Sequence, residues 1–229
     1  MDASYRRDRG QVFENRREAG KALSAALRRF SGRDDVVVLA LPRGGVPVGF
    51  EVARALGAPL DVFVVRKLGM PGHAELAMGA IASGGVRVLN EELLSAYPVS
   101  QSAIDLVTRE EQAELERRER SYRPGPPLAV RGRIVILVDD GLATGATMRA
   151  AVLALRRLAP ARVVVGVPVG AVDACRALEE VADEVVCVST PEPFQAVGLW
   201  YADFAQTSDD EVQRLLADVK ADRTAARST

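Results

Sequence analysis

The stretch ILVDDGLATGAT, from Ile136 to Thr147, joins a hydrophobic segment to a polar loop. The apolar run from Val135 to Val138 predicts a strand that is buried inside the fold. Two adjacent carboxylates, Asp139 and Asp140, follow the strand, and small residues and hydroxyls then lead into a helical pattern. A buried strand that runs through a short loop into a helix is typical of a parallel α/β sheet.

The alternation of strands and helices continues on both sides of this stretch. β-branched runs predict strands at residues 36–41, 60–65, 134–138, 162–167 and 184–188, with short strands at 79–83 and 86–89. Apolar residues at helical spacing predict helices at 13–30, 50–56, 100–121, 146–158 and 171–180, and a short helix that ends near 219. The pattern predicts a three-layer α/β fold, with a mostly parallel central sheet flanked by helices.

A chain of 229 residues fits one α/β domain with an elaboration, or two small domains. We favour a single domain over residues 1–219, with its core at about 34–190. Around the core we expect an N-terminal helix at 11–30, an insertion at about 86–122 and a C-terminal hood segment at about 190–219. The polar residues 220–229 predict a disordered tail.

The composition excludes several classes of function. The formal net charge of −1 argues against a nucleic-acid partner, and no apolar run approaches the roughly 20 residues that span a bilayer. His73 is the only histidine, which excludes a zinc site built from several His and Cys ligands. It also means that a Ser-His-Asp triad could use only His73. Cys175 and Cys187 are isolated, which predicts core positions in a reducing compartment. We therefore expect a cytoplasmic protein with no membrane or nucleic-acid partner.

The loop after residues 134–138 offers two kinds of ligand contact. In a parallel sheet, ligands bind beyond the carboxyl ends of the strands, where Asp139 and Asp140 can accept hydrogen bonds from hydroxyls or bind a cation. The loop ATGAT, Ala143 to Thr147, stands at a helix N-terminus, where free amides favour a phosphate. A phosphorylated sugar fits this pairing. The alternative, in which Asp140 opens a turn and Thr144 caps the helix, leaves the second carboxylate unexplained.

The segment IVILVDDGLATGAT, residues 134–147, resembles the phosphoribosyl-pyrophosphate (PRPP) motif of type I phosphoribosyltransferases. By this resemblance, Asp139 and Asp140 contact the 2′- and 3′-hydroxyls of the ribose. The 5′-phosphate is then bound by Ala143, Thr144, Gly145, Ala146 and Thr147. Gly141 departs from the family pattern, in which many members carry a branched apolar residue, and we expect a looser turn there.

The loop LPRGG, Leu41 to Gly45, resembles the pyrophosphate-binding loop of the same family. Gly44 and Gly45 allow backbone amides to approach an anion, and Arg43 supplies a permanently charged fork suited to phosphate. The resemblance also implies a cis peptide bond in this loop. The alternative is an ordinary turn between a strand and a helix, with a surface arginine.

The segment RKLGMPGHAELAMG, Arg66 to Gly79, predicts a mobile loop that closes over the substrate. Lys67 is the first candidate to reach pyrophosphate, and Arg66 is the second. His73 and Glu75 would be carried over the site on closure, although a lone His or Glu in a loop is more often just a solvated side chain.

The aromatic segment Phe194 to Phe204 is the best source of acceptor recognition. Trp200 and Tyr201 could stack on a ring, and Asp203 could accept hydrogen bonds. We expect Phe204, which is four residues from Trp200, to close the core, and for Trp200 both roles stay open. This segment resembles a group of bacterial phosphoribosyltransferase-domain proteins with no assigned acceptor. The resemblance as a whole spans residues 36–216.

The resemblance implies a pentosyltransferase of nucleotide metabolism, in which a nitrogen nucleophile displaces pyrophosphate from C1 of PRPP. The catalytic candidates are Asp139, Asp140, Lys67 and Arg43. The cofactor would be Mg²⁺, held mainly by ligand oxygens, with Asp139 and Asp140 as the candidate protein ligands. A homodimer is a family-level expectation. Two alternatives stay open: a regulatory protein that binds PRPP with little catalysis, and a nucleotide phosphohydrolase or phosphorylase on the same fold.

Overall fold

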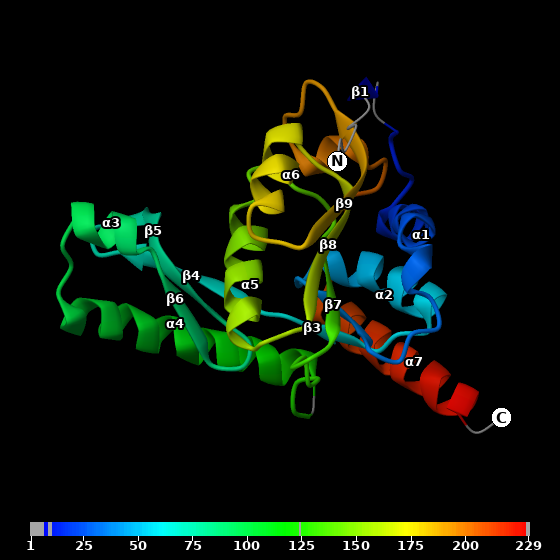
Figure 1. Cartoon of the computed structure of the whole chain (residues 1–229), viewed down its shortest axis with the longest axis horizontal. Coiled ribbons are helices and arrows are strands. Elements are labelled where there is room, and N and C mark those ends of the chain that lie inside the picture. Colours follow the sequence, from blue (N-terminus) through cyan, green and yellow to red (C-terminus); the bar gives the residue numbers. More distant parts are fainter. Residues whose placement is uncertain (1–6, 9–10, 124, 228–229) are drawn as a thin grey trace.

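A six-stranded parallel sheet forms the centre of the computed structural model, which describes residues 7–8, 11–123 and 125–227 (Figure 1). Its strand order is β1-β9-β8-β7-β2-β3, and β1 contributes only two residues. Strands β2 and β7 are in register from the pair Val36–Ile134 to the pair Ala40–Val138. The loops that follow these two strands therefore leave the sheet side by side.

The elements follow one another in an α/β order. The strands of the central sheet are β1 (Arg7–Asp8), β2 (Val36–Ala40), β3 (Leu60–Val62), β7 (Ile134–Val138), β8 (Arg162–Val169) and β9 (Glu184–Pro191). The helices around it are α1 (Arg16–Ala26), η1 (Arg28–Phe30), α2 (Gly45–Leu56), α5 (Ala146–Arg157), α6 (Val172–Glu179), η2 (Val197–Trp200) and α7 (Asp209–Arg227). The remaining elements are β4 (Val65–Met70), β5 (His73–Ala82), β6 (Val86–Leu89), α3 (Glu91–Ala96) and α4 (Gln101–Tyr122).

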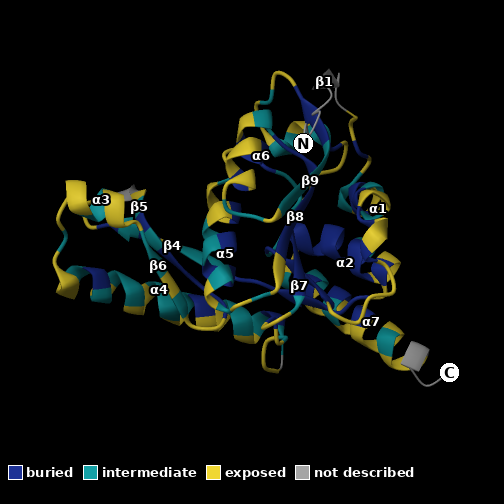
Figure 2. Cartoon of the chain, viewed as in Figure 1, coloured by how far each residue is buried: buried dark blue, intermediate teal, exposed yellow. Residues whose placement is uncertain are grey.

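Alternate residues of the central strands face two separate cores. Val36 and Val38 of β2 pack with the side of the sheet that α1, α2 and α7 cover, whereas Val37 and Leu39 pack with the side that α5 and α6 cover. All five residues of β2 are buried, because helices cover both faces of the sheet. An apolar, β-branched run suits a strand that packs on both faces. The predicted three-layer fold is confirmed, and Figure 2 shows the central strands and α2 as its most deeply buried parts.

A second, antiparallel sheet projects from the body as an arm, which consists of β4, β5, β6, α3 and α4 (Figure 1). The prediction of a loop at Arg66–Gly79 is wrong, because most of this segment is the β4–β5 hairpin, with a turn at Gly72. Leu68, Met70 and Met78 are buried in this hairpin. In the sequence, the glycines of this segment obscured the alternation of more and less buried residues that is typical of a strand. The arm thus begins at β4 and not at residue 86.

Helices α2 and α7 extend beyond their predicted limits, whereas α1 begins later than predicted, at Arg16. Helix α2 begins at Gly45 and not near residue 50, with Pro47 in its first turn, where proline fits well. Helix α7 continues to Arg227 through most of the stretch that was predicted as a disordered tail. An ion pair of 3.1 Å between Arg54 and Asp222 ties this last part of α7 to α2.

Both cysteines are free thiols. Cys175 is buried in the core beside α6, and the partly exposed Cys187 packs against the same core. Among the described residues, none of the helices is long and apolar enough to cross a membrane.

Candidate functional site

The two motifs that the sequence singled out lie against each other at the carboxyl ends of β2 and β7. Leu41 N donates to Val138 O at 2.9 Å where the two loops leave the sheet. A Cβ atom added to Gly44 would lie 2.1 Å from Asp140 Oδ2, and one added to Gly45 would lie 2.8 Å from Val138 O. Only glycine leaves room here for the LPRGG loop to touch the acid pair.

The acid pair is ordered by a hydrogen bond from the main chain, and its side chains are largely removed from water. Asp140 N donates to Asp139 Oδ1 at 2.8 Å, and the Asp140 side chain is 15% exposed. Burial, and then the charge of Asp140, raise the pKa of Asp139 well above its usual range. Burial also raises the pKa of Asp140, while Arg16 opposes that rise. Such a pair favours a ligand that brings hydroxyl donors or positive charge.

Arg16, which sequence reasoning missed, is the counter-ion of Asp140. Its Nε donates to Asp140 Oδ2 at 2.8 Å, and its Nη1 donates to Ala205 O at 2.7 Å. The guanidinium lies 3.9 Å from the centroid of the Phe204 ring, and the side chain is only 11% exposed. Arg16 and Asp140 are 124 positions apart, so no local pattern links them.

The predicted phosphate loop ends at an open helix N-terminus. Gly145 precedes α5 with φ 72°, a left-handed conformation that suits glycine, and this N-cap residue has no side chain that could cap the helix. The hydrogen bond from Ala146 N to Thr144 Oγ1 is long, at 3.4 Å, and the first turn of α5 holds no acidic residue. Ala143, Thr144, Ala146 and Thr147 are exposed. The amides at the start of α5 are therefore available to an anion.

Arg43 faces the start of α7. Its Nη1 lies 3.5 Å from Asp209 Oδ1, and its side chain is 35% exposed. The peptide bond between Pro42 and Arg43 is cis, as the family resemblance implied.

The other basic candidates lie on the arm. Lys67 is an exposed residue of β4, paired in register with Ala80. Arg66 Nε donates to Glu111 on α4 at 2.6 Å, so it is held on the arm and away from the acid pair. His73 is exposed and begins β5, next to the hairpin turn. The side chain of Glu75, the fourth candidate from this segment, lies outside the described part of the chain.

The aromatic segment contacts the acid motif through Tyr201. Tyr201 is buried, and its hydroxyl donates to Asp140 O at 2.5 Å, so its ring is not open to stacking. Trp200 stacks on Phe194, with ring centroids 6.3 Å apart, and its buried Nε1 has no hydrogen-bond partner among the described residues. Asp203 is exposed and accepts from Ala205 N at 2.9 Å. Of these three acceptor candidates, Trp200 is the one that keeps an unused donor.

Two expectations about this region are wrong. Phe204 was expected to close the core, but its side chain is 38% exposed and its ring supports Arg16. Gly141 does not loosen its turn, because Leu142 N donates to Val169 O at 3.0 Å and holds the turn in place. A Cβ added to Gly141 would lie 2.6 Å from Val197 Cγ1, so the glycine makes room for η2.

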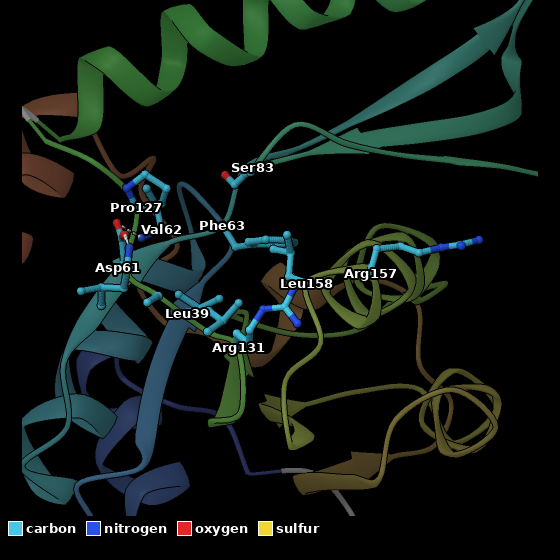
Figure 3. Close-up of a pocket in the computed structure, with 13 residues that line it drawn as sticks. Leu39, Asp61, Val62, Phe63, Ser83, Pro127, Arg131, Arg157 and Leu158 are labelled. Carbon is cyan, nitrogen blue, oxygen red and sulfur yellow. Dashed lines mark hydrogen bonds between the residues drawn. The ribbon is translucent and has the colours of Figure 1, made fainter.

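A separate cavity of about 310 Å³ lies between β3, the segment 127–131 and the end of α5 (Figure 3). Asp61, a buried polar side chain in its wall, is fully engaged: it accepts from Leu128 N at 2.9 Å and Val62 N at 2.8 Å and pairs with Arg123 at 3.2 Å. Burial raises the pKa of Asp61, and Arg123 opposes the rise. This carboxylate holds the segment that follows α4 against β3 and is not left available for a ligand.

Known proteins are similar to this chain in both sequence and fold. A model of the phosphoribosyl transferase domain matches residues 9–202. Two Mycobacterium tuberculosis proteins, "Putative phosphoribosyl transferase Rv0571c" and its counterpart MT0597 in another strain, are 49% identical over 207 residues. The match covers 90% of this chain but 46% of theirs, so the chain spans about half the length of these relatives. The crystal structure of TT1426 from Thermus thermophilus is 45% identical, with a TM-score of 0.81 over 91% of this chain and 99% of that one. The chain belongs to the phosphoribosyl transferase domain family.

Proposed function

We propose that this protein binds PRPP and transfers its 5-phosphoribosyl group to a nitrogen nucleophile, with release of pyrophosphate. The observation that carries the proposal is the contact between Gly44 and Asp140, where a single added carbon would lie 2.1 Å from the carboxylate. It brings an anion-binding loop and a pair of hydroxyl acceptors to one point. In the chain, the acid pair is followed by a short loop that ends at Gly145, and the open N-terminus of α5 comes next. A sugar with an anion at each end matches this arrangement.

Each group has a distinct role in this proposal. Asp139 and Asp140 bind the ribose hydroxyls, and the loop Ala143–Thr147 binds the 5′-phosphate. The amides of Gly44 and Gly45 bind pyrophosphate, together with Arg43 and Lys67. For Arg43 this requires an exchange of partners, because the pyrophosphate would replace Asp209, which pairs with it at 3.5 Å.

The chemistry needs positioning and charge more than a protein nucleophile. The bond from C1 to the pyrophosphate oxygen breaks, the bond from C1 to the acceptor nitrogen forms, and the acceptor's proton passes to the released pyrophosphate or to water. Positive charge grows on the ribose in between, and the nearby carboxylates stabilise it, while Arg43 and Lys67 stabilise the negative charge of the leaving group.

The donor set also fits Mg²⁺ bound together with substrate. No group of three or more His, Cys, Asp or Glu side chains that could hold a metal occurs in the described ranges. The oxygens of Asp139 and Asp140 are ligands of the type that Mg²⁺ prefers, but they are too few for an all-protein site. Bound mainly through diphosphate oxygens, the ion would neutralise the leaving group.

The direct test measures binding and turnover separately. PRPP with Mg²⁺ should raise the melting temperature of the wild-type protein, because the ligand binds only the folded state. Pyrophosphate release should then be followed with purines, pyrimidines and small amines as acceptors. A melting temperature unchanged by millimolar PRPP would end the proposal.

A regulatory PRPP-binding protein is the second candidate, because Arg43 and Asp140 already have partners within the chain. Stabilisation by PRPP without pyrophosphate release for any acceptor would select it. Phosphate release from nucleotides, with no response to PRPP, would select the phosphohydrolase or phosphorylase. Sedimentation or light scattering would test the homodimer that the family resemblance leads us to expect.

A further inference from the structure

We propose that Arg16 is a positioning residue that sets the orientation of Asp140 for the ribose hydroxyls. The inference rests on the proposed function, since it assigns a task in sugar recognition to a residue outside the PRPP motif. Arg16 does not need to touch the sugar itself. It acts through the one carboxylate oxygen that it binds.

The contacts of Arg16 leave its guanidinium little freedom. Three neighbours hold it: Asp140 Oδ2 at 2.8 Å, Ala205 O at 2.7 Å and the Phe204 ring at 3.9 Å. The fork is planar, so its two hydrogen bonds and its stacking fix one orientation. At 11% exposure, water competes little for these contacts.

Two segments far apart in the sequence are tied together around Arg16. We call residues 201–209 the strap. Phe13 N donates to Trp200 O at 2.9 Å, Ala202 N to Phe13 O at 2.8 Å, and Asp203 N to Glu14 O at 2.8 Å. Asn15 then caps α1, accepting from Arg17 N at 3.0 Å, so the helix must begin at the next residue, Arg16.

The strap reaches the acid motif at two further points. Tyr201 donates its hydroxyl to Asp140 O at 2.5 Å, which holds the main chain of the aspartate. Asp209, at the end of the strap, pairs with Arg43 of the LPRGG loop. The strap therefore supports the main chain of Asp140 directly and its side chain through Arg16.

An aspartate carboxylate rotates readily, because the torsion next to it has only broad minima. The hydrogen bond from Arg16 fixes Oδ2 and leaves Oδ1 as the oxygen that meets a ligand. Loss of Arg16 would free the rotation and leave a largely buried carboxylate without its cation. Recognition of the ribose hydroxyls should then weaken, while the phosphate and pyrophosphate loops stay intact.

The opposite role is an inhibitory plug, in which Arg16 occupies the place of the ribose and must leave before binding. The two roles predict opposite signs. Without Arg16, a plugged site would bind the sugar more tightly, whereas a site that Arg16 orders would bind it more weakly and distinguish its hydroxyls less well.

The test compares Arg16→Ala with Arg17→Ala, a matched control on the same helix. Arg17 is 47% exposed, pairs with Glu51 at 3.6 Å and lies over the Phe50 ring. The probes are ribose 5-phosphate and 2-deoxyribose 5-phosphate, with inorganic pyrophosphate as a probe of the other loop, and binding is measured by calorimetry. A hydrogen bond to a charged group predicts that the wild-type protein prefers ribose 5-phosphate by about tenfold.

We expect Arg16→Ala to lose most of this preference while it keeps its affinity for pyrophosphate, and Arg17→Ala to keep both. Millimolar methylguanidinium should restore the preference in Arg16→Ala, because it can occupy the space against Phe204; such rescue is not expected of a merely structural defect. If Arg16→Ala does not fold, Arg16→Lys decides: it keeps the charge but not the fork, so a full wild-type preference in that variant overturns the inference.

The outcomes separate the two proposals. A wild-type preference, or tighter sugar binding, in Arg16→Ala overturns the role of Arg16 and leaves the proposed function standing. If the wild-type protein binds neither these sugar phosphates nor PRPP, the proposed function fails, and the role of Arg16 fails with it.

Discussion

Gly44→Ala is the sharpest single test of how the two loops meet. Gly44 has φ −59° and ψ −34°, a conformation open to any residue, so alanine brings no backbone strain. Its Cβ would nevertheless lie 2.1 Å from Asp140 Oδ2 and 2.8 Å from Asp140 Cγ. The short aspartate side chain can avoid this clash only by breaking its 2.8 Å contact with Arg16.

The expected magnitudes follow from these contacts. Disrupting a largely buried ion pair lowers the free energy of unfolding by up to about 3 kcal/mol. Replacing glycine by alanine makes the unfolded chain stiffer, which offsets about 0.4–1 kcal/mol of this loss. We therefore expect a net loss of about 2 kcal/mol. PRPP affinity should fall by about 10- to 100-fold, the range for a lost hydrogen bond to a charged group.

Two other glycines serve as references. In Gly45→Ala the Cβ would meet the main chain of β7, 2.8 Å from Val138 O, which cannot move aside, so stability should fall by about 3 kcal/mol. Gly125 has no atom within 4 Å of an added Cβ, so Gly125→Ala should be close to neutral. Urea unfolding and calorimetric titration with PRPP measure the two quantities. Wild-type PRPP affinity in a folded Gly44→Ala protein would refute the reasoning.

Three further predictions concern charged groups. Asp140→Asn should lower kcat/KM by about 10²-fold, the scale of one preorganised electrostatic group, and an unchanged pyrophosphate-release rate would contradict its role. Arg123→Ala should lower the free energy of unfolding in urea by about 3–5 kcal/mol, because it leaves the 7%-exposed Asp61 unpaired, whereas the exposed control Arg120→Ala should change it by no more than about 1 kcal/mol. Two neighbouring arginines lower the pKa of Glu114 from 4.5 to about 2, so its contribution to stability is present above pH 4.5 and lost as the pH falls towards 2. An NMR titration of its carboxyl group with a midpoint near the unshifted value of 4.5 would contradict this.

The sequence was most informative where a local pattern and a global rule agreed. The apolar runs at 36–40 and 134–138 predicted buried strands, and both strands are buried on the two faces of the sheet. Parallel strands end at one edge of a sheet, so the LPRGG loop and the acid pair could be expected to meet there. Their contact at Gly44 and Asp140 follows from that rule and from the register of β2 with β7.

Features that depend on distant contacts could not be predicted. Arg16 and Arg17 are identical in sequence terms, and only the fold places one beside Asp140 and the other beside Glu51. The glycines of the β4–β5 hairpin led to the prediction of a loop, although Leu68 and Met78 are fully buried there. Phe204 was expected in the core because it is four residues from Trp200, but the chain at 201–203 pairs with residues 13–14 and is not helical.

The pairing of Phe13 with Tyr201 has a consequence for how the protein is made. Synthesis proceeds from the N-terminus, so Arg16 leaves the ribosome well before Asp140, and Phe204 and Ala205 emerge later still. Until the last of them is free, the nascent chain lacks the Ala205 carbonyl and the Phe204 ring that hold Arg16 in place. The contacts around Arg16 therefore form only late in the translation of this domain, when the strap has paired with residues 13–14.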